Sequence, residues 1–281
     1  MYILFDIGGT KMRIAASRNG SEILDSKIVP TPKDFWEGMQ TIKKISYDLI
    51  KGEKIDSAAG GIAGPLNKEK TMLVNSPNLP GWVEKPLVGE LEHILASSVY
   101  IENDTAMVGL GEAIHGAGAK YSIVAYVTVS TGVGGVRIVD EHIDRSAAGF
   151  EIGHHIINFS SEAKCPSCEA GGHLEAYVSG AALEGYFEKK PYEITDPSVW
   201  EETAKILAYG LNNVAVFWSP EIIVLGGAMI VGNPAIPMDR IKYYFEETCK
   251  IFAENPVIEK ASLGDVGGLY GAMEYLRQNL I

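Results

Sequence analysis

The chain has 281 residues, a length that fits one or two domains of ordinary size. Hydrophobic residues make up 46% of it and charged residues 21%, as in soluble globular proteins, which excludes disorder for the bulk of the chain. With 24 Lys and Arg against 36 Asp and Glu, the net charge is −12 and no basic patch stands out, so neither nucleic acid nor an anionic membrane is expected as a partner.

The start of the chain, MYILFDIGGTK, lacks the charged and long apolar regions of a signal peptide. No apolar run approaches the ~20 residues that a membrane-spanning helix needs. Three cysteines cannot form a disulfide framework, and two of them lie close together, which indicates a reducing compartment or a metal. We therefore expect a soluble, cytoplasmic protein.

The first half of the chain alternates short apolar runs with turns and helical segments. Strands are predicted where apolar runs lie between turn residues, over residues 2–7, 12–17, 22–29, 55–62 and 98–102. Helices are predicted from apolar spacing and start signals, over residues 34–51, 86–95 and 105–115.

The second half begins with the same pattern. Strands are expected over residues 122–129, 136–140 and 221–225, and helices from Asp196-Pro197 to Phe217, over 239–252 and over 268–279. Each half thus opens with a strand, a glycine-rich turn carrying a Thr, and a returning strand. This duplication predicts two α/β lobes with an active-site cleft between them: residues 1–108, joined by the C-terminal helix 268–281, and residues 109–267.

The first glycine-rich turn, DIGGTK, covers residues 6–11. Glycines let the backbone approach phosphate oxygens, and free N–H groups there bind anions. A phosphate and a Mg²⁺ could be held by Asp6, Gly8, Gly9, Thr10 and Lys11, with the carboxylate reaching the metal through water. The alternative is a plain hairpin turn. The segment matches neither a P-loop nor a dinucleotide-binding fingerprint.

The second turn, STGVGG, covers residues 130–135 and repeats the first. Two equivalent turns would grip a polyphosphate from both sides, through Thr131, Gly132 and Gly134. A third turn, Gly226-Gly227, follows a buried strand and would pass under an adenine or ribose. The alternative there is a tight connection from strand to helix.

These three turns resemble the two phosphate motifs and the adenosine motif of the actin/hexokinase/Hsp70 ATPase superfamily. Within it, residues 75–82, 102–104, 151–154 and 174–177 resemble the ROK family (repressors, open reading frames and kinases). The motifs follow the family order from residue 3 to about residue 272. The resemblance implies an α/β fold of two actin-like (ribonuclease H-like) lobes and a phosphotransferase that uses ATP and Mg²⁺ and forms a homo-oligomer, a dimer or tetramer.

The resemblance also assigns roles to polar residues. Asp104 is the implied catalytic base, which accepts the proton of the attacking hydroxyl. From the residue alone, an ordinary helix cap is the alternative. The implied sugar-binding residues are Gly64, Asn78, Asn103, Asp104, Glu151, His154 and Glu175. Surface charge is the alternative for the three in the second half.

A Cys-Pro-Ser-Cys segment at residues 165–168 suggests a metal site. ROK proteins usually carry C-x-C-G-x-x-G-C here, so this chain departs from the family, with Glu169 in place of a glycine. Two Cys and two His suit a tetrahedral Zn²⁺, and we expect a structural zinc bound by His154, Cys165, Cys168 and His173. His155 competes with His154, which is preferred because it falls on the family's Glu-x-x-His position. The alternative is a loop without metal.

The expected function is ATP-dependent phosphorylation of the 6-hydroxyl of a hexose, with glucose first because the sugar motif is glucokinase-like. Fructose, N-acetylmannosamine and N-acetylglucosamine stay open. A sugar-responsive repressor of the same family is disfavoured because the first phosphate motif begins at residue 3. A non-catalytic sugar-sensing protein is disfavoured by the presence of Asp6, Asp104 and both turns.

Overall fold

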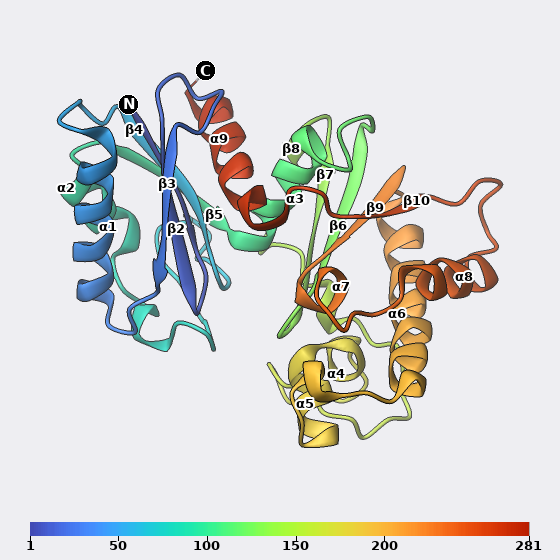
Figure 1. Cartoon of the computed structure of the whole chain (residues 1–281). Coiled ribbons are helices and arrows are strands. Elements are labelled where there is room, and N and C mark those ends of the chain that lie inside the picture. The colour runs from blue at the N-terminus through green and yellow to red at the C-terminus, as the bar shows by residue number, and fades with distance from the viewer. Residues whose placement is uncertain (281) are drawn as a thin grey trace. The chain divides into compact units, whose positions relative to one another are not determined.

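The computed structural model describes residues 1–280 (Figure 1). They form two compact units. Unit 1 comprises Met1–Gly111, Arg145–Gly149 and the chain from Leu263 onward, and unit 2 comprises Glu112–Asp144 and Phe150–Ser262. The sequence prediction divided the chain at residues 108 and 267 instead.

Unit 1 is built on a mixed five-stranded sheet. Its strands are β1 (Tyr2–Ile7), β2 (Lys11–Ser17), β3 (Asp25–Pro30), β4 (Ser57–Ile62) and β5 (Ser98–Asn103). The strand order is β3-β2-β1-β4-β5; β1 pairs antiparallel with β2 and parallel with β4, which pairs parallel with β5. Every residue of β4 is buried, which explains its uninterrupted run of small and apolar residues.

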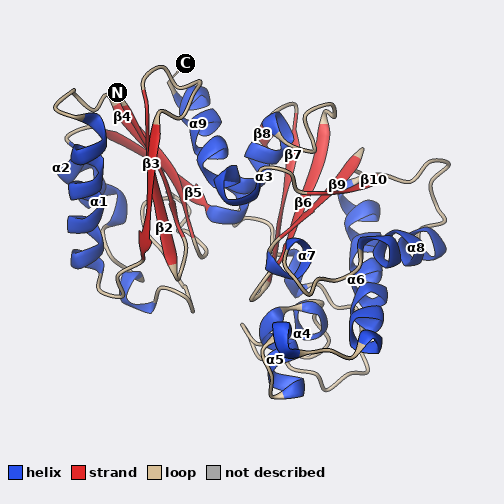
Figure 2. Ribbon diagram, in the orientation of Figure 1, coloured by secondary structure: helices blue, strands red, loops and turns tan. Residues whose placement is uncertain are grey.

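Helices cover both faces of this sheet (Figures 1 and 2). On one face, α1 (Phe35–Ile50) and α2 (Leu87–Leu95) share the core with β1 and β2. On the other face lies α9 (Gly267–Asn279), which packs with the start of α3 (Asp104–His115). Gly271 allows this packing, because a Cβ there would lie 1.7 Å from the backbone oxygen of Met107.

Unit 2 repeats the same sheet topology. Its strands are β6 (Ile123–Val129), β7 (Val133–Val139), β8 (His142–Ile143), β9 (Ile222–Gly226) and β10 (Val257–Lys260). In the order β8-β7-β6-β9-β10, β6 pairs antiparallel with β7 and parallel with β9, as β1 does with β2 and β4. The duplication predicted from the sequence is therefore confirmed.

The helices of unit 2 are α4 (Glu175–Val178), α5 (Gly180–Phe187), α6 (Pro197–Trp218), α7 (Ala228–Val231) and α8 (Met238–Thr248). Asp196 caps α6 as predicted, accepting a hydrogen bond from the Ser198 backbone N–H at 2.9 Å. The buried stripe of α6 includes Trp200, Leu207 and Leu211, and it shares the unit's core with the sheet and α8.

Two local expectations were wrong, and several elements were not predicted. The returning strand β7 begins at Val133 rather than at residue 136, so Gly134 lies in a strand, opposite Thr128, and not in the turn. The helix α8 ends at Thr248 rather than at 252, because the Asn255 side chain donates a hydrogen bond to the Cys249 carbonyl at 3.0 Å. β8, β10 and the short helices α4, α5 and α7 were not predicted.

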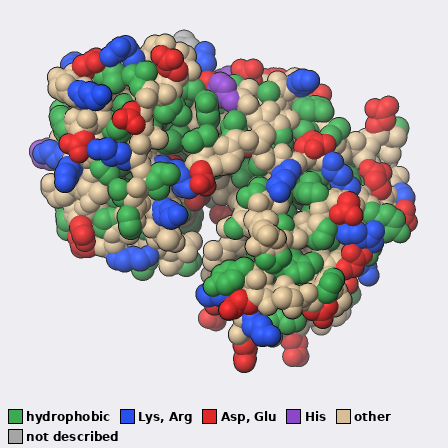
Figure 3. Space-filling view, viewed as in Figure 1, with side chains coloured by type: hydrophobic (Ala, Val, Ile, Leu, Met, Phe, Trp, Pro, Cys, Tyr) green, Lys and Arg blue, Asp and Glu red, His purple; other side chains and the backbone are tan. Residues whose placement is uncertain are grey.

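On the face shown in Figure 3, acidic and basic side chains are interspersed and no extended basic patch forms. In the part of the chain that the structure describes, no helix has both the length and the apolar character required to cross a membrane.

Candidate active site

The first glycine turn (turn 1, Gly8–Thr10) connects β1 to β2 and presents free backbone amides. Gly8 N–H donates to the Lys11 carbonyl at 3.0 Å, and the Thr31 hydroxyl donates to the Gly8 carbonyl at 2.7 Å. Among residues 1–280, no partner is found for the amides of Gly9 and Thr10. Turn 1 can therefore donate hydrogen bonds to an anion such as a phosphate. Lys11 is the exposed first residue of β2.

Asn78 lies directly against turn 1. A Cβ on Gly9 would come within 2.4 Å of the Asn78 Cβ, so only glycine fits there. The loop carrying Asn78 is fixed by Ser76, whose buried hydroxyl donates to the Ala63 carbonyl at 2.8 Å. The exposed Asn78 side chain is thus held beside the turn.

Asp6, at the end of β1, is part of a charged group that the sequence did not reveal in full. Arg13 on β2 contacts Asp6 Oδ2 at 3.3 Å and Asp265 Oδ1 at 2.9 Å. Burial raises the pKa of Asp6, and the Arg13 cation opposes that rise. The signal for Arg13 was present, since it is a charged residue inside the apolar run MRIAAS.

Asn103 and Asp104 lie where β5 ends and α3 begins, and only the first of them caps the helix. Asn103 caps the helix, because its Oδ1 accepts from the Ala106 N–H at 3.2 Å, while its Nδ2 donates to the Gly64 carbonyl at 3.2 Å. Gly64 has a φ of +127°, which strongly favours glycine. The capping role considered for Asp104 is thus filled by Asn103.

The carboxylate of Asp104 is therefore available for other chemistry. Its Oδ1 accepts a hydrogen bond from the Thr105 N–H at 2.8 Å. Burial, and secondarily the negative charge of Asp6, raises the pKa of Asp104 to about 6. A carboxylate of this pKa is ionised at neutral pH and is basic enough to accept a proton from a hydroxyl during attack.

The second glycine turn (turn 2, Ser130–Gly132) connects β6 to β7 in unit 2. Ser130 N–H donates to the Gly132 carbonyl at 2.8 Å. The first amides of α5 bind the turn's carbonyls: Gly180 N–H donates to Ser130 at 2.7 Å and Ala181 N–H to Thr131 at 3.0 Å. Within the described chain, the Thr131 and Gly132 amides have no partner, so turn 2 also presents two N–H donors.

Glu175, the first residue of α4, is only 3% exposed, and both of its carboxylate oxygens have partners. Oε2 accepts from the Val133 N–H at 2.8 Å, next to turn 2. Oε1 accepts from the Ser167 hydroxyl and from the Cys165 thiol, the latter at 3.3 Å. A carboxylate has about four acceptor positions, so these bonds leave capacity for a further donor such as a sugar hydroxyl.

A pocket of about 370 Å³ lies beside turn 2, and its volume falls in the range of small-ligand sites. Turn 2, the start of α5, residues 190–192 and α7 line it. The third glycine turn leads into α7: Gly226 ends β9, and Gly227 has a φ of +87° with no room for a Cβ, which would lie 2.2 Å from the Val129 oxygen.

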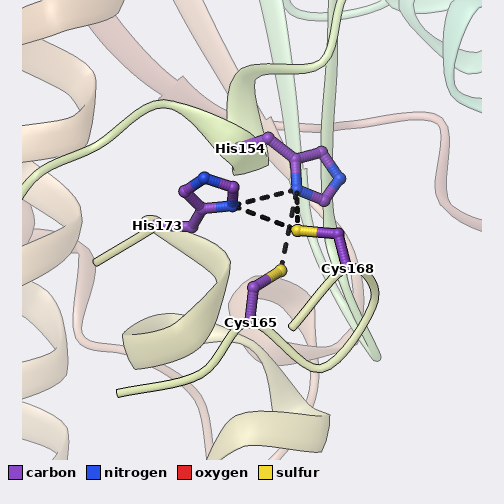
Figure 4. Close-up of side chains that lie close together, drawn as sticks. All are labelled: His154, Cys165, Cys168 and His173. Carbon is purple, nitrogen blue, oxygen red and sulfur yellow. Dashed lines mark hydrogen bonds between the residues drawn. The ribbon is translucent and has the colours of Figure 1, made fainter. Parts of the chain in front are cut away.

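His154, Cys165, Cys168 and His173 meet in one cluster, with all four ligand atoms within 4.8 Å of one another (Figure 4). The two His Nδ1 atoms are 3.3 Å apart, and the Sγ atoms lie 3.4 to 3.6 Å from the nitrogens they face. A tetrahedral Zn²⁺ with ordinary bond lengths separates two nitrogens by about 3.3 Å and a nitrogen from a sulfur by about 3.6 Å. The cluster therefore has the dimensions of a zinc site.

His154 links this cluster to Glu151. Its Nδ1 faces the other ligand atoms, and its Nε2 lies 3.7 Å from the Glu151 Oε2. Burial raises the pKa of Glu151, and a charge on His154 opposes the rise. The structure places His154 rather than His155 in the cluster, and the His155 Nε2 is buried without a hydrogen-bond partner in the described chain.

The structure combines three features. Its two sheets share one topology, each sheet carries a glycine turn that presents free amides, and unit 1 holds a carboxylate suited to proton transfer. They are the features of a phosphotransferase with a hydroxyl acceptor in the actin-like ATPase superfamily.

The chain belongs to the ROK family, whose model matches residues 2–279. It is 27% identical to the N-acetyl-D-glucosamine kinase of Pasteurella multocida, a match covering 95% of this chain and 96% of that protein. Its fold matches a ROK hexokinase from Thermus thermophilus with a TM-score of 0.86, 26% identity and 100% and 99% coverage of the two chains. A ROK glucokinase from Streptomyces griseus, solved with glucose and AMPPNP, gives a TM-score of 0.77 at 23% identity, with 98% and 99% coverage.

Proposed function

We propose that this chain is an ATP-dependent kinase that phosphorylates the 6-hydroxyl of a hexose, with glucose as the first candidate. The observation that carries the proposal is Asp104, a half-buried carboxylate with a pKa of about 6, in a fold that presents free amides from two glycine turns. Units 1 and 2 are the two lobes of the proposed kinase.

The proposed reaction assigns a task to each group. Asp104 accepts the proton of the sugar hydroxyl as its oxygen bonds to the γ-phosphorus of MgATP, and the bond from that phosphorus to the β-γ bridging oxygen breaks to release ADP. The amides of turns 1 and 2 donate hydrogen bonds to the phosphate oxygens. Asp6 is an oxygen ligand of the kind that Mg²⁺ prefers and would hold the metal of MgATP through water.

The residues proposed to bind the sugar are Gly64, Asn78, Asn103, Asp104, Glu151, His154 and Glu175. Hydroxyl groups both donate and accept hydrogen bonds, so carboxylate, amide and imidazole groups suit them. The Streptomyces griseus glucokinase, which was solved with glucose, supports glucose, and the Pasteurella multocida kinase supports N-acetylglucosamine as the second candidate. N-Acetylmannosamine and fructose follow.

A coupled assay of ADP formation over a panel of hexoses and N-acetylhexosamines tests this proposal. We expect one sugar to give a far higher kcat/KM than the others, and ³¹P NMR of the product to place the phosphate on the 6-oxygen. Sugar binding detected by calorimetry without ADP formation from any member of the panel would instead identify a sugar-sensing protein.

We further propose that His154, Cys165, Cys168 and His173 bind one structural Zn²⁺. The interatomic distances support this, and so does the donor set, because thiolate and imidazole are the preferred ligands of this ion. The metal would fix the segment from Glu151 to Glu175, which carries three of the proposed sugar-binding residues.

Metal analysis of protein purified without chelator should find about one zinc per chain. Cys168→Ser should lose zinc and weaken sugar binding, while Cys249→Ser, outside the cluster, should keep the metal. Zinc-free wild-type protein with full sugar affinity would contradict the proposal.

A further inference from the structure

Glu175 joins two parts of unit 2 that are distant in sequence. One of its carboxylate oxygens accepts from the Val133 N–H, directly after turn 2. The other accepts from the Ser167 hydroxyl in the segment between the two cluster cysteines (the metal loop, residues 165–168). A chain of hydrogen bonds thus runs from the metal loop through Glu175 to turn 2.

The burial of Glu175 makes its position depend on these hydrogen bonds. A buried carboxylate is costly unless its hydrogen bonds are made, so loss of one partner favours movement of the group. The space beside turn 2 is filled by this same carboxylate, because a Cβ on Gly132 would lie 2.7 Å from Glu175 Oε2. A movement of Glu175 would therefore displace the Val133 amide and change the direction of the free amides of turn 2.

We propose that Glu175 is a positioning residue that sets the geometry of turn 2 from the metal loop, so that the loop controls nucleotide affinity. The inference rests on the proposed function, because it takes turn 2 as a phosphate-binding element. It assigns Glu175 a role toward the nucleotide that is separate from its proposed contact with the sugar.

Ser167 is the residue at which the link can be tested without changing a metal ligand. It is neither a ligand in the metal cluster nor one of the proposed sugar-binding residues, and its hydroxyl forms the loop end of the link. Ser160 is a matched control, since it is an exposed serine outside the metal loop whose backbone N–H, rather than its side chain, makes its hydrogen bond to Asn158.

The experiment compares Ser167→Ala, Ser160→Ala and wild type. Calorimetry measures the Kd of AMPPNP with Mg²⁺ and, separately, the Kd of the preferred sugar, and NMR measures hydrogen exchange of the Val133 amide. For Ser167→Ala we expect about three- to tenfold weaker AMPPNP binding, the usual effect of one hydrogen bond, with faster Val133 exchange and unchanged zinc content. Sugar affinity should fall as well, because the displaced Glu175 is one of the proposed sugar-binding residues. Ser160→Ala should match wild type throughout.

Glu175→Gln gives a second, independent measurement. It keeps the shape of the side chain but removes the charge, so AMPPNP binding should weaken and sugar binding should weaken too. Adding Ser167→Ala to Glu175→Gln should then have little further effect on AMPPNP affinity, because both changes act on one link. Melting temperatures of all variants exclude unfolding as the cause.

Three results would overturn the inference. They are wild-type AMPPNP affinity and Val133 exchange in Ser167→Ala, additive effects in the double variant, or a nucleotide defect accompanied by loss of zinc, which would make the metal itself the cause. Failure of the proposed function looks different: wild-type protein would then form no ADP with any sugar of the panel, and Val133 exchange would still report on the link.

Discussion

The two units share a strand order but place different chemistry at equivalent positions. In unit 1, Asp6 on β1 faces Arg13 on β2, next to turn 1. In unit 2 the equivalent pair on β6 and β7 is Thr128 and Gly134, which carries no charge. At this pair of positions the sheet of unit 1 therefore holds ionised side chains, while the sheet of unit 2 holds neutral ones.

The two turns are also held differently. Turn 1 is fixed by side chains from a neighbouring loop, the Thr31 hydroxyl and the Lys33 ammonium group, which donate to its carbonyls. Turn 2 is fixed by the backbone amides at the start of α5 and adjoins the Glu175 carboxylate. This difference shows how a duplicated turn can keep its free amides while the groups that hold it change.

The largest effect on activity is expected from a substitution in unit 1. Asp104→Asn should lower kcat about 10²- to 10⁴-fold, because an amide keeps the shape of the side chain but cannot accept the proton. Sugar affinity, measured by calorimetry, should change much less.

Asp48→Asn serves as the matched control, since Asp48 is an exposed carboxylate on α1 paired with Lys27. Its kcat should equal that of wild type. A wild-type kcat in Asp104→Asn would show that this residue has no catalytic role.

A pair of glycine substitutions distinguishes the two turns. Gly132→Ala would press on the Glu175 carboxylate and should weaken AMPPNP binding about tenfold, on the scale of overpacking costs. Gly9→Ala would displace Asn78 and should weaken both AMPPNP and sugar binding. Calorimetry measures both affinities. If the two substitutions weakened the binding of both ligands equally, the proposed difference between the turns would be contradicted.

The smallest effect concerns pH. The ionised form of Asp104 is the active base, so kcat/KM should be level above pH 6 and fall about tenfold per pH unit below it. In Asp6→Asn the residual activity should show this fall at lower pH, because the charge of Asp6 contributes to raising the pKa of Asp104. Asp265 has an exposed carboxylate, so Asp265→Asn should leave the dependence of kcat/KM on pH unchanged. A shift of the fall to another pH in that variant would contradict its assignment to Asp104 and Asp6.

Long periodic or apolar segments made most of the fold predictable. The stripe of α1 and the wholly buried run of β9 each left a clear pattern. β10 left none, because only Ile258 of its four residues is buried and an edge strand needs no apolar face. The start of β7 was missed because Gly134 and Gly135 suggest a turn, whereas pairing with β6 makes them a strand.

The candidate site was predictable where the residue type limits the chemistry. Cysteine and histidine at metal-binding spacing identified the cluster, and glycine marked both turns. Ser167 could not have been found, because a serine in a polar loop looks the same whether it faces water or a buried carboxylate. The capping role of Asn103 was also open, since either Asn103 or Asp104 could begin a helix.

The packing of α9 on the sheet of unit 1 has a consequence for synthesis of the chain. Leu4, Ala59 and Met107 are covered by a helix made only after the whole of unit 2. At about 5–20 residues per second, these side chains wait about ten seconds or more on the ribosome. Unit 2 should therefore resist protease before unit 1 does in arrested nascent chains, although unit 1 emerges first; early protection of unit 1 would contradict this order.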